Sequence, residues 1–191
     1  MNVIAHDAGG KVKLRLPEGM DGFATFIGDR QQFRTHLVRW WGDLIERASA
    51  KYALWIGMNP STADWNFNDP TVAREIKYTK DHLGLNRYIK MNVMDFRSTD
   101  PKALLSMRRD ERCSPQNHSE ILEYASKAEI VIAAWGSLPR VLRQHAIEVE
   151  EMLRQAGIKL HCVGYTQDGS PRHPLYVRGD APLLPYPREA A

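Results

Sequence analysis

Four apolar runs alternate with helical patterns along most of the chain. The runs cover residues 52–58, 88–93, 130–134 and 158–163. Each has the length of a buried strand, about 4–8 residues, and is bounded by turn-forming residues. Strands of this kind, separated by helices, are typical of a parallel sheet that is covered on both faces. The pattern therefore predicts an α/β fold.

Helix boundaries are marked by capping residues. Asp69 is a good N-cap, and Pro70 stands at the first helical position of a helix that ends near Gly84. Further helices are predicted at residues 102–107, from 114 to 127 and at 140–156, the last of them stopped by Gly157. These helices fall between the four apolar runs, as a layered α/β fold requires.

The two ends of the chain carry weaker patterns. Residues 11–16 alternate as a short edge strand, residues 23–27 read as another strand, and residues 32–46 fit both strand and helical spacing. The stretch after Gly179 is rich in proline and predicts an extended wrap or a frayed end.

We therefore expect a three-layer α/β/α sandwich with a central, mostly parallel four-stranded sheet. The chain is expected to be one domain, with an N-terminal β extension (1–30), an α/β core (31–178) and a Pro-rich tail (179–191).

Composition restricts the function only mildly. The 191 residues are 43% hydrophobic, which is enough for a core, and the net charge of +3 permits nucleic-acid binding without arguing for it. Cys113 and Cys162 do not form a disulfide framework, so a reducing cytoplasm is the expected location. No window approaches about 18 apolar residues, so no membrane partner is expected. The oligomeric state is left open.

Known cofactor motifs are missing from the sequence. There is no phosphate loop, dinucleotide fingerprint, nucleophile elbow or zinc spacing, so we expect neither a cofactor nor a metal. The chemistry must then come from side chains at the ends of the strands, where ligands bind in open α/β sheets.

Polar and aromatic side chains follow each predicted strand. The candidates, in chain order, are Asn59, Ser61, Thr62, Asp64, Asn92, Arg97, Trp135, Arg172 and His173. Asn59 fits either turn geometry or ligand binding, and Trp135 fits either core packing or a floor under a base. Arg97 can pair locally or hold a phosphate. His173 lies between Arg172 and Pro174 in a stiff polar segment and can stabilise a developing negative charge.

Several of these segments resemble the DUF1643 family of bacteria and phages. The similar residues run in order over roughly 30–187. They include Met58-Asn59-Pro60-Ser61-Thr62-Ala63-Asp64, Asp69-Pro70-Thr71, Phe96-Arg97-Ser98-Thr99-Asp100-Pro101, Ala133-Ala134-Trp135-Gly136 and Arg172-His173-Pro174-Leu175-Tyr176. This family has no assigned activity.

The same order of motifs is more distantly similar to the uracil-DNA glycosylase superfamily. The shared elements are Gly57-Met58-Asn59-Pro60 after the first strand, Trp135-Gly136 after a later one, and His173-Pro174 near the end. This resemblance implies that Asn59 positions a water, that His173 stabilises the departing base, and that Asn92 reads the base edge. Leu175 stands where that superfamily usually has Ser.

Three functions fit these observations. The leading one is a nucleobase or nucleotide site with glycosylase-like hydrolysis of an N-glycosidic bond, for which Asn59, Asp64 and His173 are the catalytic candidates. An amide is a poor general base, so Asp64 is the nearest candidate for that role. The second is a non-catalytic nucleotide or nucleic-acid binding module in which Arg97, Arg172 and Ser61 contact phosphate. The third is an enzyme acting on a small nucleotide-like metabolite in phage DNA modification or defence.

Overall fold

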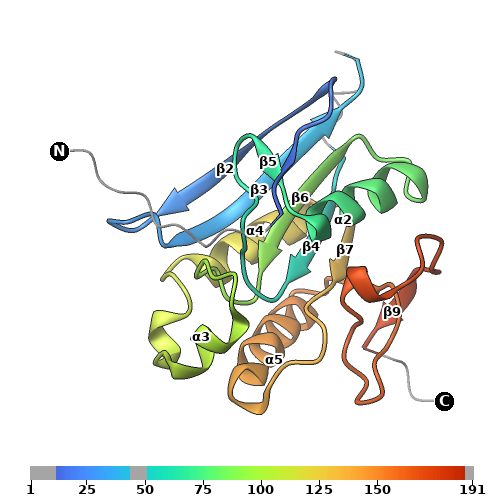
Figure 1. Ribbon diagram of the computed structural model, residues 1–191. Helices are drawn as coiled ribbons and strands as arrows, with labels where there is room; N and C mark the ends of the chain where they lie inside the picture. Colours follow the sequence, from blue (N-terminus) through green and yellow to red (C-terminus); the bar gives the residue numbers. More distant parts are fainter. Residues whose placement is uncertain (1–11, 44–50, 188–191) are drawn as a thin grey trace.

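A seven-stranded mixed sheet forms the centre of the computed structural model, which describes residues 12–43 and 51–187 (Figure 1). The strand order is β2-β3-β6-β4-β7-β8-β9. In chain order the strands are β2 (Met20–Ile27), β3 (Phe33–Trp41), β4 (Ala53–Gly57), β6 (Arg87–Asn92), β7 (Ile130–Ala133), β8 (Leu160–Cys162) and β9 (Leu184–Tyr186). The α/β class is confirmed, but the sheet is wider than the four strands predicted.

The extra strands come from the two ends of the chain. The four apolar runs supply β4, β6, β7 and β8, which pair in parallel. β2 and β3 form an antiparallel hairpin, and β3 pairs antiparallel with β6. β9, in the Pro-rich tail, pairs antiparallel with β8. Residues 33–41 are therefore a strand, whereas residues 44–46 of that ambiguous segment lie outside the described residues.

Helices cover both faces of the sheet and make two cores. On one face α2 (Pro70–Asp81) packs its Val72 and Ile76 in a cluster with Trp55 and Ile132 of the sheet. The opposite face carries α3 (Pro101–Ser106), α4 (Asn117–Lys127) and α5 (Arg140–Gln155). Figure 1 shows α2 and α4 on opposite sides of the strands. Within the described ranges, no helix has both the length and the apolar character to span a membrane.

A bulge in β3 sends two nearby residues to opposite faces. Thr25 pairs with His36 and Phe26 with Arg34, so Thr35 is an extra residue in the ladder. Side chains two positions apart in a regular strand share a face, but the bulge breaks this rule. His36 consequently meets α4, whereas Arg34 reaches the opposite side and donates from Nη1 to the Ala63 carbonyl at 2.9 Å.

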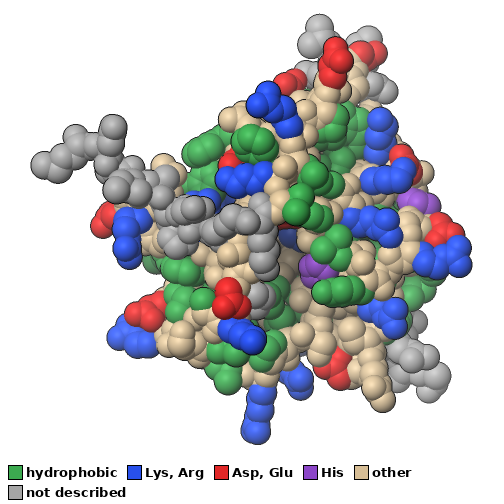
Figure 2. All heavy atoms as spheres, in the orientation of Figure 1, with side chains coloured by type: hydrophobic (Ala, Val, Ile, Leu, Met, Phe, Trp, Pro, Cys, Tyr) green, Lys and Arg blue, Asp and Glu red, His purple; other side chains and the backbone are tan. Residues whose placement is uncertain are grey.

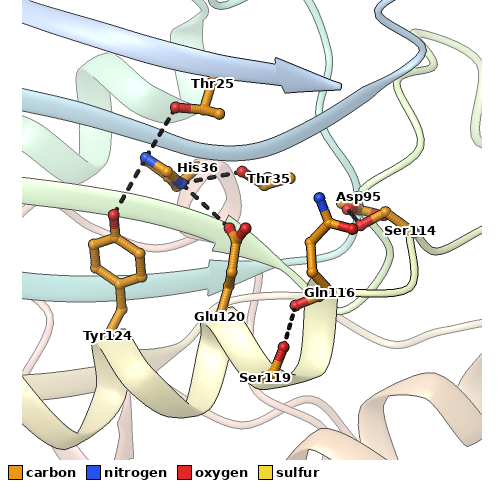
Figure 3. A network of polar contacts seen from close by, with 9 residues as sticks. All are labelled: Thr25, Thr35, His36, Asp95, Ser114, Gln116, Ser119, Glu120 and Tyr124. Carbon is orange, nitrogen blue, oxygen red and sulfur yellow. Dashed lines mark hydrogen bonds and ion pairs between the residues drawn. The ribbon is translucent and has the colours of Figure 1, made fainter. Parts of the chain in front are cut away.

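His36 ties the hairpin to α4 (Figure 3). Its Nε2 lies 3.0 Å from Thr25 Oγ1 and 3.3 Å from Tyr124 Oη, and its Nδ1 lies 3.5 Å from a Glu120 carboxylate oxygen. Burial lowers the pKa of His36, and the Glu120 carboxylate acts against that shift. These contacts of His36 hold the β2–β3 hairpin against α4, on the face of the sheet opposite α2.

The carboxyl ends of the parallel strands define one edge of the sheet. From β4 the chain passes through α2 to β6 on one side, and it then returns to β7 on the other side of β4. Such a reversal of strand order leaves a crevice outside the strand ends, which is where open α/β sheets bind ligands. The crevice here lies beside the loops after β4 and β7.

Arg39 of β3 anchors the long loop after β4. It is fully buried and donates from Nε to Asn68 Oδ1 at 2.9 Å and from Nη2 to the Phe67 carbonyl at 3.1 Å. Phe67 and Asn68 form β5, which pairs with β1 (Leu14–Arg15) in a separate two-stranded sheet. The loop is thus fixed at its far end, and the polar residues before it keep a defined position.

Candidate functional site

A cavity of about 510 Å³ lies at the carboxyl edge of the sheet. It is bounded by the loop after β4, the start of α2, the end of β6, Trp135 after β7 and the segment that contains His173. Figure 2 shows this face hollowed near its centre, with hydrophobic side chains around the opening. Its volume falls within the range of small-molecule sites, about 300–1000 Å³.

Most of the predicted site residues line this cavity. They are Asn59, Ser61, Thr62, Asn92, Trp135 and His173. They come from four separate segments of the chain, and the parallel strand order brings these segments together. Trp135 is buried and meets Tyr186 of β9 edge to face, with ring centroids 5.6 Å apart. It therefore belongs to the core and to the cavity wall at once.

Three predicted residues do not line the cavity. Asp64 Oδ1 accepts from the backbone N–H groups of Asn66 at 2.9 Å and Phe67 at 3.0 Å, so this carboxylate closes a turn. Arg97 donates from Nη1 to the Gln31 carbonyl at 3.0 Å, and its guanidinium lies over the Phe26 ring. The hairpin therefore holds Arg97.

Arg172 is the third of these residues. Its Nε donates to the Tyr165 carbonyl at 3.0 Å, and it lines a second pocket beside Tyr176. It follows that neither of the arginines predicted to hold a phosphate belongs to the main cavity.

Asn59 presents an acceptor to the cavity. Its Nδ2 donates to the carbonyls of Pro60 at 3.0 Å and Ser98 at 2.8 Å. Both amide hydrogens are thereby used, and Oδ1 makes no hydrogen bond to the part of the chain that the structure describes. This oxygen can hold a water molecule, but it cannot remove a proton from it.

Asn92 and Lys90 stand together at the end of β6. A Cβ on Gly57 would lie 2.6 Å from Lys90 Nζ and 3.0 Å from Asn92 Oδ1, so only glycine fits beneath them. Asn92 is 1% exposed, and its Nδ2 has no hydrogen-bond partner among the described residues. A buried donor in this state costs free energy until a ligand or water accepts from it.

Lys90 belongs to a buried ionic cluster. Its Nζ donates to Glu75 Oε1 at 2.6 Å, and Tyr88 Oη donates to Glu75 Oε2 at 2.6 Å. Burial raises the pKa of Glu75, and the Lys90 ammonium acts against that shift. Because Glu75 is on α2 and Lys90 is on β6, the cluster also fixes the helix against the sheet.

His173 supplies a neutral imidazole. Burial lowers its pKa to about 4, and the nearby Lys90 ammonium acts in the same direction. Its Nδ1 accepts from the Leu175 backbone N–H at 3.4 Å. In the neutral ring the proton is then on Nε2, so His173 offers one N–H donor at neutral pH.

The structure adds three charged residues that were not among the predicted site residues. Arg34, Lys90 and Asp69 all line the cavity. Lys90 is a charged residue within an apolar run, which is a signal for a site, and for Asp69 the sequence favours a helix cap over a site role. That cap is confirmed, because Asp69 Oδ1 accepts from the Val72 N–H at 2.8 Å. Arg34 had no sequence signal, since the Thr35 bulge decides which face it takes.

Several other arginines make their hydrogen bonds and ion pairs outside the cavity. Arg112 is buried and donates to the carbonyls of Leu104 and Met107, and Arg108 pairs with Asp110 on the surface. Arg109 forms an ion pair with Glu148. These residues, together with Arg140 and Arg143, are not among the residues that line the cavity.

Cys113 and His145 approach each other without forming a reactive pair. Cys113 Sγ lies 3.6 Å from His145 Nδ1. Burial raises the pKa of the Cys113 thiol to about 12 and lowers that of His145 to about 4. A thiolate is the nucleophilic form of cysteine, and burial keeps Cys113 in the thiol form at neutral pH.

The fold and the cavity define an α/β protein with a ligand-sized site at the carboxyl end of its parallel strands. The family model whose description is "Protein of unknown function (DUF1643)" matches residues 34–175. The chain belongs to this family, which confirms the membership expected from its motifs. No curated protein and no solved structure matches the chain.

Proposed function

We propose that the cavity binds a nucleobase and that the protein hydrolyses the N-glycosidic bond of a nucleoside or nucleotide. The observation that carries this proposal is the buried Asn92 amide, whose Nδ2 lacks a partner within the described ranges and whose residue lines the cavity. Beside it are the Lys90 ammonium and the neutral His173. These groups make one wall rich in hydrogen-bond donors, and carbonyl oxygens and ring nitrogens of a base are the matching acceptors.

Such a wall suits a base that leaves as an anion. When the C1′–N bond breaks, its electron pair passes to the ring nitrogen, and donors already in place stabilise the new charge. His173 offers Nε2–H, and Lys90 offers an ammonium nearby whose charge is shared with Glu75. The donors strengthen their interaction only as the bond breaks, which is the condition for catalysis.

The sugar and the water need different groups. The sugar carbon gains positive charge in this step, and the Asp69 carboxylate is the negative group at the cavity wall. Asn59 Oδ1 can orient a water whose oxygen bonds to C1′. The water proton ends on the released base, so atoms and charge balance. Asp69 is thus the carboxylate at the site in place of Asp64, with an electrostatic role instead of the general-base role predicted for Asp64.

The placement of the arginines favours a small substrate over duplex DNA. The surface arginines at positions 108 and 109 are paired with carboxylates, and Arg97 and Arg172 lie outside the cavity. Duplex binding depends mainly on basic groups gathered near the site. The order of the Asn59-Pro60, Trp135-Gly136 and His173-Pro174 motifs, similar to that of uracil-DNA glycosylases, supports chemistry on a base.

Release of free base tests the proposal. We would incubate the protein with inosine, uridine, their 2′-deoxy forms and single-stranded oligonucleotides containing uracil or hypoxanthine, and would separate the products by chromatography. We expect free base from at least one substrate, and a loss of about 10²–10³-fold in kcat for His173→Phe, which removes a donor to the developing anion.

The Asp64→Asn variant is the matched control, because that carboxylate closes a turn outside the cavity. It should keep its activity. Binding of nucleosides without any release of base would leave a binding module and overturn hydrolysis. If cooperatively folded protein neither binds nor cleaves any of these compounds, the whole proposal is wrong.

A further inference from the structure

A second cluster of polar groups lines the same cavity. Arg34, Thr62 and Asp69 all line it and are at most 8% exposed. Arg34 Nη1 donates to the carbonyl of Ala63, the neighbour of Thr62, at 2.9 Å. Asp69 is the carboxylate with the strongest electrostatic effect on Arg34, where it opposes the lowering of the Arg34 pKa by burial. The three residues therefore form one cluster.

Hydrogen-bonding capacity is left unused in this cluster. Thr62 Oγ1 and Arg34 Nε are buried and have no partner among the described residues. Asp69 uses Oδ1 to cap α2 through Val72, and its Oδ2 makes no hydrogen bond within the ranges described. The cluster thus offers a donor, an acceptor and a hydroxyl that can act as either.

This mixed character differs from the donor wall around Asn92 and Lys90. Two neighbouring sugar hydroxyls, each of which donates one hydrogen bond and accepts others, match such a set. We infer that the cavity takes a ribonucleoside, with its base against Asn92 and its 2′,3′-diol against Asp69, Thr62 and Arg34. The inference rests on the proposed function and adds the class of sugar.

A phosphate beside this cluster fits less well. The Asp69 carboxylate already accepts from the Val72 N–H, and Pro70 carries no N–H, so neither residue gives an anion a free backbone donor at the start of α2. The Arg34 charge is already faced by the carboxylates of Asp69, Glu75 and Asp64. A neutral diol uses the same groups without adding negative charge next to Asp69.

Matched pairs of nucleosides test the inference. We would measure the shift in melting temperature and, where base is released, kcat/KM with inosine against 2′-deoxyinosine and with uridine against 2′-deoxyuridine. Loss of a hydrogen bond to a buried charged group should make each 2′-deoxy form weaker by about tenfold or more.

Two variants should erase this preference. Asp69→Asn keeps an N-cap for α2 but loses the carboxylate, and Thr62→Val removes only the hydroxyl. Both should bring the ribo and 2′-deoxy values together, whereas Asp64→Asn keeps the preference of the unmodified protein. Equal values for ribo and 2′-deoxy forms, or a preference for 2′-deoxy forms, would overturn the inference and leave base hydrolysis standing. Failure of every nucleoside to bind would overturn both.

Discussion

His173 has two properties that matter for the proposed reaction. It lines the cavity, and it is neutral well below neutral pH because burial and the Lys90 ammonium both lower its pKa. Its donor is therefore Nε2–H, since Nδ1 is held by the Leu175 backbone. Because the ring is neutral, it needs no carboxylate partner of its own, and its N–H can hydrogen-bond directly to the departing base anion. The protonation state of this one ring is consequently the first quantity to measure.

We expect a titration of the His173 ring by NMR to give a midpoint near pH 4. Lys90→Met should move the midpoint upward, because removing a like charge makes the imidazolium less costly. Lys77→Met is the control: Lys77 is exposed and pairs with Asp81, so the midpoint should not change. A midpoint near 6.5 in the unmodified protein would show that the ring is solvated and would remove the basis for its role.

The same pKa value fixes the sign of a stability effect. An unfolded histidine titrates near pH 6.5, whereas folded His173 titrates near 4, so between these values the unfolded chain binds more protons. The contribution of His173 to folding stability is therefore complete above about pH 6.5 and is lost as the pH falls toward 4. His145 adds a contribution of the same sign.

At the scale of elements, α2 connects the site to the fold. Asp69 caps its first turn and lines the cavity, and Glu75 on its buried face holds Lys90 of β6. Among the described helices α3 also has an aspartate cap, where Asp100 Oδ1 accepts from the Lys102 N–H at 2.9 Å. Asp100 is exposed and lies outside the cavity. A comparison of the two aspartates therefore distinguishes the effect of capping a helix from the effect of lining the cavity.

Asp69→Ala should lower the free energy of unfolding by about 1–2 kcal/mol, because the Val72 N–H loses its partner at a buried helix end. Asp69→Asn should lower it by less than Asp69→Ala, since asparagine keeps the cap and only the carboxylate charge that faces buried Arg34 is lost. Urea denaturation measures both. Asp100→Ala, at an exposed and shorter helix, should cost less than Asp69→Ala. Equal losses for Asp69→Asn and Asp69→Ala would show that charge rather than capping stabilises α2.

At the scale of the whole molecule, the sequence predicted the parts that follow from local pattern. The four central strands, the Asp69 cap and the gathering of Asn59, Asn92, Trp135 and His173 all follow from apolar runs and from the rule that ligands bind at strand ends. The sheet width was not predictable in this way, because β3 joins β6 and β9 joins β8 over long sequence separations, and β2 enters the sheet only through its hairpin with β3. Arg34 was missed for a related reason, since its direction depends on one extra residue in a ladder.

Removing the tail tests how far the site depends on that long-range pairing. A chain that ends at Gly179 loses β9, the hydrogen bond from Tyr78 Oη to the Ala181 carbonyl and the contact of Tyr186 with Trp135. We expect at least about 2 kcal/mol of lost stability in urea, since partly buried Leu183, Leu184 and Tyr186 no longer cover apolar surface. Tryptophan fluorescence should shift to the red as water reaches Trp135. Tyr186→Phe keeps the ring and should leave the emission maximum unchanged.

Trp135 also forms part of the cavity wall. The shortened chain should therefore bind nucleosides more weakly even at urea concentrations below its unfolding transition. Unchanged binding would show that the cavity wall keeps its structure without β9.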